Sequence, residues 1–143
     1  MLARTLGCLG LLGVTVAVHS IGLTAMLRWV WRSPVLEDPR FWPGTWLLVR
    51  VAWCLIAIHV LEIAVWASFY WWQACLPDAA SALYFSGVTY ATIGYGDLLL
   101  PAEWRLLGPV EGLTGILMCG LSTGFFFAMV RRISEVRRGR GRA

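Results

Sequence analysis

The sequence predicts an all-α membrane protein in which three helices cross the bilayer and a short helix enters it between the second and third crossings. Two observations indicate this fold class. Hydrophobic residues make up 59% of the 143 residues and charged residues only 14%, with a mean hydropathy of +0.69, so there is too little polar surface to cover a water-soluble globule. The apolar residues also gather into long runs, which leaves no room for a separate soluble domain.

The first expected span runs from Leu6 to about Leu27 and is long enough for hydrocarbon, which needs about 20 helical residues. His19 is the only ionisable residue in its interior, and we expect it to contact another helix rather than bind a ligand. Arg4 before an apolar run is also typical of a cleaved signal peptide. The run is long, however, and no Ala-x-Ala-like site follows it, so we expect the helix to be retained.

Residues 28–45 are expected to form a polar loop, because they include three prolines and both signs of charge. Several tryptophans here suit the membrane interface, where the indole N–H stays hydrated. Residues 46–72 form the second expected span, with His59 and Glu62 on one helix face near its middle. Ionisable groups at this depth are costly unless they face protein, so we expect this pair to point into the helix bundle.

Residues 80–91 are apolar but too short to cross a bilayer, and they lead directly into the glycines of the stretch 94–96. Asp78 or Ser81 would suit the start of this helix as a cap. The combination predicts a re-entrant helix followed by irregular backbone. Irregular backbone at membrane depth is tolerated only where protein or a water-filled cavity surrounds it, so we expect this segment to line a pore or cavity.

The third expected span covers residues 108–130, and a basic tail that we expect to fray covers 131–143. All twelve basic residues of the chain are arginines, and the tail holds six of them: Arg131, Arg132, Arg137, Arg138, Arg140 and Arg142. In a membrane protein such a tail marks the cytoplasmic side rather than a nucleic-acid site. We expect the protein in the cell (inner) membrane, where three crossings place the N-terminus on the outer side. Membrane lipids are expected partners.

The four cysteines show no spacing of a metal site. Cys8, Cys54 and Cys119 fall within apolar runs and are expected to be core thiols, whereas Cys75 lies in an outer loop where pairing between subunits is an option. No nucleophile and base pattern is present either. We therefore expect neither an enzyme nor a cofactor.

The functional signal lies in residues 92–97, which read Thr-Ile-Gly-Tyr-Gly-Asp. A cation that leaves water needs replacement oxygens, since an unpaired charge in a low-dielectric medium costs roughly tens of kcal/mol. Rings of backbone carbonyls can supply them. Successive carbonyls point toward one axis only if the backbone alternates in handedness, which Gly94 and Gly96 permit without steric cost.

The other four positions of this stretch suit the same geometry. Ile93 and Tyr95 would point away from the axis and wedge the ribbon against its supporting helix. Thr92 would add a hydroxyl at the inner end, and Asp97 would concentrate cations at the outer mouth.

The stretch resembles the selectivity filter of potassium channels, differing from its commonest form by Ile93 in place of Val. The preceding Ala82-Leu83-Tyr84-Phe85-Ser86 resembles the family's pore helix, and the flanking helices look like small bacterial members of the two-transmembrane, pore-loop superfamily. The resemblance covers about residues 46–130, the expected pore domain, and leaves 1–45 as an extra helix and loop. It implies passive K⁺ conduction by a homotetramer, because one chain supplies one of the four ribbons required. The implied K⁺ sites and their supports are Thr92, Ile93, Gly94, Tyr95 and Gly96 in the filter, with Tyr84, Phe85 and Thr89 around it.

Some features depart from the family pattern or stay open. Val88 stands where some bacterial channels carry a Glu that bonds to the outer Asp. The resemblance also suggests Gly115 as the hinge of the third helix, with Gly112 and Gly120 as rivals. Glu111 and Arg105 lie near the depth of the filter and could brace it or form an interfacial ion pair. Neither early helix shows the arginine spacing of a voltage sensor.

Two roles are open for His59 and Glu62: a structural hydrogen bond between helices, or a proton-sensing gate. The gate hypothesis predicts that His59→Gln abolishes any pH dependence of current, and an unchanged pH response would reject it. Two functions compete with a channel: a subunit of a potassium-uptake transporter, and a non-conducting regulatory or assembly subunit. Transporters of that kind usually carry four pore loops in one long chain.

Overall fold

The computed structural model describes residues 2–37 and 40–140. Within this part of the chain the regular elements are all helical: α1 Leu2–Trp31, the short 3₁₀ helix η1 Pro34–Glu37, α2 Phe41–Trp72, α3 Ala79–Tyr90 and α4 Leu107–Arg140. Three stretches are long and apolar enough to cross a membrane, namely Leu9–Trp31, Trp42–Trp72 and Leu107–Val136. The predicted fold class, with three spans and a short helix before the last, is confirmed.

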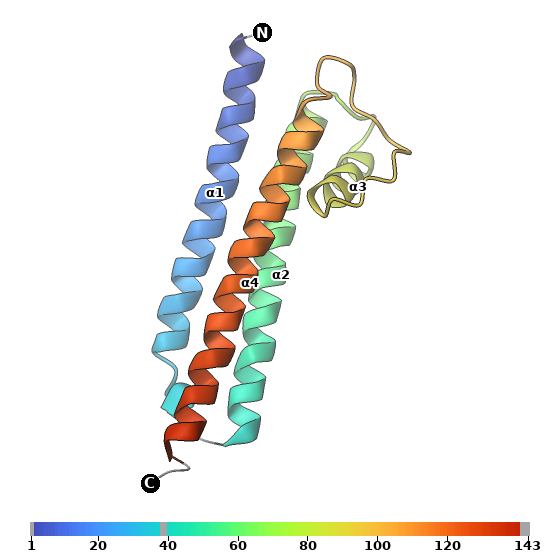
Figure 1. The fold of residues 1–143 in the computed structure, drawn as a ribbon. Coiled ribbons are helices and arrows are strands. Elements are labelled where there is room, and N and C mark those ends of the chain that lie inside the picture. The colour runs from blue at the N-terminus through green and yellow to red at the C-terminus, as the bar shows by residue number, and fades with distance from the viewer. Residues whose placement is uncertain (1, 38–39, 141–143) are drawn as a thin grey trace.

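The three long helices run side by side, and α3 lies at the end of the bundle where the chain begins (Figure 1). α1 leads away from that end, α2 returns to it, and α4 leads away again. The described chain therefore starts at the same end of the bundle as α3 and finishes at the opposite end. α3 contacts both α2 and α4, which hold it in place.

Several helix ends differ from the predicted ones. α1 continues to Trp31, and α2 begins at Phe41, so much of the expected loop is helical. Pro43 is compatible with this start, because the first turn of a helix has no intrahelical partner for its N–H groups. α4 continues beyond residue 130 to Arg140, so the tail does not fray there. Arginine is a good helix former, and Arg131 pairs with Glu135 one turn later at 2.8 Å; Arg142 lies outside the described residues.

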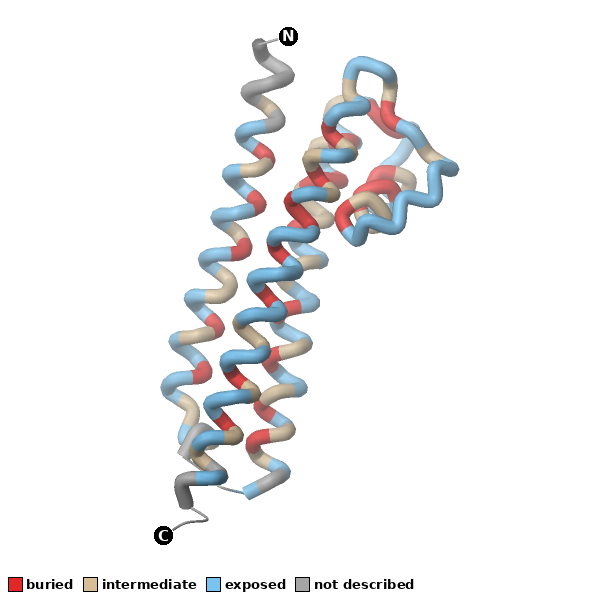
Figure 2. The backbone as a smooth tube through the Cα atoms, in the orientation of Figure 1, coloured by how far each residue is buried: buried red, intermediate tan, exposed pale blue. Residues whose placement is uncertain are grey.

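Buried positions lie on the helix faces that turn toward one another, whereas exposed positions follow the outer faces (Figure 2). One hydrophobic cluster, around Trp66, Tyr70 and Phe85, joins the re-entrant end of the bundle. A second, around Met26, Val51 and Met129, joins the opposite end. Large hydrophobic side chains also cover the outside of all three long helices. Such a surface suits lipid or neighbouring subunits rather than water.

The position of α1, which the sequence left open, is against both α2 and α4. Gly22 makes this approach close, because an added Cβ would lie 2.7 Å from Cδ1 of Ile58. Trp66 Nε1 donates a hydrogen bond of 3.0 Å to the buried hydroxyl of Thr15. Small residues and interhelical hydrogen bonds are the usual means of packing helices in lipid.

The expectation of core thiols is wrong for Cys54 and Cys119, which are exposed on the chain; the side chain of Cys8 lies outside the described residues. In a membrane helix an apolar position can face lipid as well as the core, so hydropathy does not separate the two. Cys75 is buried, and burial raises the pKa of its thiol. Both facts disfavour a disulfide between subunits.

Candidate functional site

The re-entrant helix α3 begins at a defined cap. Of the two predicted caps the structure uses Asp78, whose carboxylate accepts hydrogen bonds from the backbone N–H of Ser81 at 2.8 Å and from its hydroxyl at 3.0 Å. These bonds lower the pKa of Asp78. The helix ends at Tyr90, and its C-terminal carbonyls, which carry partial negative charge, adjoin the ribbon that follows.

The ribbon after α3 has alternating handedness. Gly94 and Gly96 have φ of 54° and 78°, as the motif predicted. Thr92 also has positive φ, at 60°, which the sequence did not indicate and which costs a non-glycine residue about 1–2 kcal/mol. Hydrogen bonds to α3 stabilise this strained conformation of Thr92. The N–H groups of Ile93 and Gly94 both donate to the carbonyl of Val88, at 2.8 and 3.0 Å.

The ribbon is exposed on the single chain, with Ile93 and Tyr95 54% and 69% accessible. Of the aromatic pair expected to surround Tyr95, Phe85 is buried and packs edge-on against Tyr70, with ring centroids 5.4 Å apart. Within one chain Phe85 therefore packs into the hydrophobic core behind the ribbon.

Tyr84 fixes the outer end of the ribbon. Its hydroxyl donates to the carboxylate of Asp97 at 2.8 Å. Val88 cannot bond to Asp97 as the Glu of some bacterial channels does. The hydroxyl of Tyr84, four positions earlier, is the hydrogen-bond partner of Asp97 here. No periodicity signals this bond, because it joins a helix to a loop thirteen positions away.

A buried carboxylate supports α3 from behind. Glu111 on α4 is 0% exposed and accepts hydrogen bonds from the hydroxyls of Tyr70 at 2.7 Å and Ser86 at 2.5 Å. Arg105 instead donates to the carbonyl of Leu100. Of the two alternatives for Glu111, the contacts favour a brace behind the pore helix over an ion pair with Arg105.

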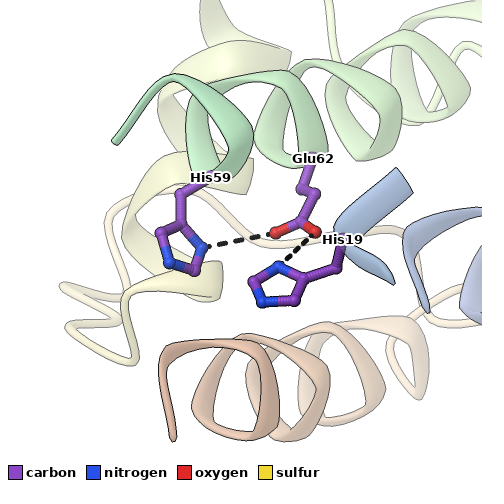
Figure 3. Close-up of side chains that lie close together, drawn as sticks. All are labelled: His19, His59 and Glu62. Atoms are coloured by element: carbon purple, nitrogen blue, oxygen red, sulfur yellow. Dashed lines mark hydrogen bonds and ion pairs between the residues drawn. The ribbon is translucent and has the colours of Figure 1, made fainter. Parts of the chain in front are cut away.

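A second buried polar cluster lies deeper in the bundle, and Figure 3 shows its core. His19 on α1 and Glu62 on α2 are fully buried and meet at 2.9 Å. His59 lies beside the same carboxylate, and Tyr90 of α3 donates to it. The predictions that His19 contacts another helix and that His59 and Glu62 face the interior are confirmed. The sequence did not indicate that His19 and Tyr90 share this carboxylate, because the partners lie on separate helices.

Gly115 brings α4 against the end of α3. A Cβ there would overlap the backbone carbonyl of Tyr90, and one at Gly112 would lie 3.4 Å from the carbonyl oxygen of Thr89. Close approach therefore accounts for the small residues. α4 is continuous through Gly115, so its role as a hinge stays a prediction. Thr89, named as a filter support, accepts a hydrogen bond from the N–H of Thr92 at 2.9 Å.

These features define a multi-pass membrane protein in which a braced re-entrant helix carries a backbone ribbon of alternating handedness between two spans. Residues 46–132 match the profile of a family described as ion channels, which is more than half of the chain. The chain belongs to this ion channel family. Comparison with curated proteins and with solved structures found no significant match.

Proposed function

We propose that this chain is one subunit of a homotetrameric, potassium-selective channel that conducts K⁺ passively. The observation that carries the proposal is the alternation of positive φ at Thr92, Gly94 and Gly96. This alternation suits a ribbon whose carbonyls turn toward a common axis, where they replace the hydration shell of the ion. The carbonyl oxygens of Ile93 and Tyr95 complete the set of ion ligands, and Asp97, on the adjoining loop, concentrates cations at the mouth.

The surroundings of the ribbon support a cation rather than an anion. α3 directs its C-terminal end at the ribbon, and the partial negative charge of a helix C-terminus favours cations. Asp97 adds a carboxylate at the exposed end, which Tyr84 holds by a hydrogen bond. Behind the ribbon, Glu111 and its hydroxyl donors fix the helix rather than contact the ion.

The exposure of the site supports the proposed tetramer. One chain supplies one ribbon, and a closed ring of carbonyls needs several copies around an axis. Residues 91–97 are all exposed on the chain, and α4 exposes a large apolar surface that neighbouring copies would cover. Its members are Leu113, Ile116, Leu117, Leu121 and Phe127.

The arginine-rich end of α4 favours a cytoplasmic C-terminus in the cell membrane. The first residues and the re-entrant helix lie at the opposite end of the bundle (Figure 1) and would then face outside. In that orientation the ribbon opens to the outer solution at Asp97, and the membrane lipids and the permeant K⁺ are the expected partners besides the chain itself.

Ion flux from purified protein in liposomes tests this function. We expect K⁺ efflux with little Na⁺ flux, and loss of at least tenfold in K⁺ flux for Gly94→Ala, since alanine is strained at positive φ. Gly13→Ala is the matched control, because an added Cβ at Gly13 meets nothing within 4 Å. Equal Na⁺ and K⁺ flux would reject selectivity. No flux at any pH or voltage would reject conduction and favour a non-conducting subunit.

A further inference from the structure

The buried cluster around Glu62 brings together three side chains of metal-binding type. His19, His59 and Glu62 each offer a ligand atom, and these atoms lie within 4.8 Å of one another. The contacts from the carboxylate to Nδ1 of the two rings are 2.9 Å for His19 and 3.3 Å for His59. A tetrahedral zinc site with bonds of about 2.0–2.1 Å separates neighbouring ligand atoms by roughly 3.3 Å. The two contacts between the carboxylate and the rings are therefore close to the spacing of such a site.

The hydrogen-bond partners Glu62 and Tyr90 define one consistent choice of tautomer for the two rings. The Glu62 carboxylate can only accept, so His19 bonds to it through an Nδ1–H. Tyr90 gives its own proton to Glu62, so its oxygen accepts from the Nδ1–H of His59 at 2.9 Å. In this tautomer each ring carries its proton on Nδ1, and both Nε2 atoms are acceptors.

Those two Nε2 atoms converge on one hydroxyl. Ser122 Oγ lies 3.0 Å from Nε2 of His59 and 3.4 Å from Nε2 of His19. A single hydroxyl proton can satisfy one ring only, so the other nitrogen faces an oxygen lone pair. A cation bound at the two Nδ1 atoms removes this conflict, because each ring then carries its proton on Nε2 and Ser122 can accept from both.

We propose that His19, His59 and Glu62 form a binding site for a divalent transition-metal ion of the Zn²⁺ type, with Ser122 orienting both imidazoles. Two imidazoles and one carboxylate are a recurrent ligand set for zinc. The Glu62 carboxylate cancels one of the two charges. The remaining charge lies beside the hydroxyl oxygen of Tyr90, which bonds to Glu62 and His59. His59 is 19% exposed and provides the open edge of the site.

The site would connect α1, which lies outside the matched residues 46–132, to helices that lie within them. His19 comes from α1, the other two ligands come from α2, and Ser122 comes from α4. Tyr90, which bonds to the cluster, lies two positions before Thr92. If the chain conducts ions as proposed, metal occupancy should change conduction, because the bound ion would hold α1 and the end of α3 together.

Equilibrium dialysis of the purified full chain tests the site without measuring conduction. The protein carries no polyhistidine tag, is stripped with EDTA in detergent, and is dialysed against Zn²⁺ or Mg²⁺ before elemental analysis. We expect one Zn²⁺ per chain and no Mg²⁺ retention, since Mg²⁺ prefers an all-oxygen shell. Glu62→Gln should weaken Zn²⁺ binding at least tenfold, whereas Glu111→Gln, the matched change at another buried carboxylate, should leave it intact.

Two further measurements keep the proposal testable if Glu62→Gln fails to fold. Ser122→Ala removes only the orienting group and should weaken Zn²⁺ binding about 10–100-fold. Co²⁺ bound to the wild type should show visible bands of nitrogen and oxygen ligation without a thiolate charge-transfer band, which excludes Cys54 and Cys119. No bound Zn²⁺ would overturn the proposal, as would Zn²⁺ binding unchanged by His19→Gln. Either failure leaves K⁺ flux unaffected, so it is distinct from failure of the channel proposal.

Discussion

The contact between Gly115 and the end of α3 predicts a large effect from one added methyl group. In Gly115→Ala the new Cβ would overlap the carbonyl oxygen of Tyr90 and lie 2.9 Å from its carbonyl carbon and 3.2 Å from its Cγ. Two of these are backbone atoms, so a rotamer change cannot relieve the clash. Overpacking of this kind costs about 1–3 kcal/mol, and α4 would have to move away from the ribbon that follows Tyr90.

Gly120→Ala is the matched change, since an added Cβ at Gly120 meets nothing within 4 Å. There alanine should stabilise the helix by up to about 1 kcal/mol. The two variants should therefore differ by roughly 1–4 kcal/mol in the free energy of unfolding in detergent, measured by denaturant titration. Equal stabilities would refute the close approach. Loss of conduction in Gly115→Ala without loss of stability would instead favour the hinge.

Other predictions concern the braces of α3. Glu111→Ala removes the hydrogen bonds that Tyr70 and Ser86 donate to one buried carboxylate and should cost about 1–3 kcal/mol, seen as a lower melting temperature; an unchanged value would contradict the brace. Asp78, whose pKa is lowered by its bonds to Ser81, stabilises the fold above the usual carboxyl pKa of 3.8, and this contribution is lost as pH falls through the lowered pKa. The melting temperatures of wild type and Asp78→Ala should therefore differ at pH 6 and converge in acid, and a constant difference would exclude the charged cap.

The elements of this fold that were predictable are those with a local signal. Long apolar runs located the three spans, and the shortness of residues 80–91 identified the re-entrant helix. The glycines at 94 and 96 indicated the alternating backbone that the structure contains. Each of these inferences needs only composition or spacing along a few turns of chain.

The parts that were missed depend on which helix faces meet. Membrane helices are apolar on both lipid-facing and protein-facing sides, so hydropathy did not show that Cys54 and Cys119 are exposed. The contact between His19 and Ser122 joins positions 103 residues apart, and no local pattern encodes it. Positive φ at Thr92 also has no sequence signal, because threonine adopts it only where the surrounding contacts hold it there.

The reversal potential of the wild-type channel tests the central claim most directly. Purified protein is placed in a planar bilayer with a tenfold K⁺ gradient, with Na⁺ replacing K⁺ on the dilute side. The proposal predicts a current that reverses close to the K⁺ equilibrium value, which is about 59 mV in magnitude for a monovalent ion. A current that reverses near zero would show that Na⁺ and K⁺ pass equally and would contradict a carbonyl filter formed by residues 92–96.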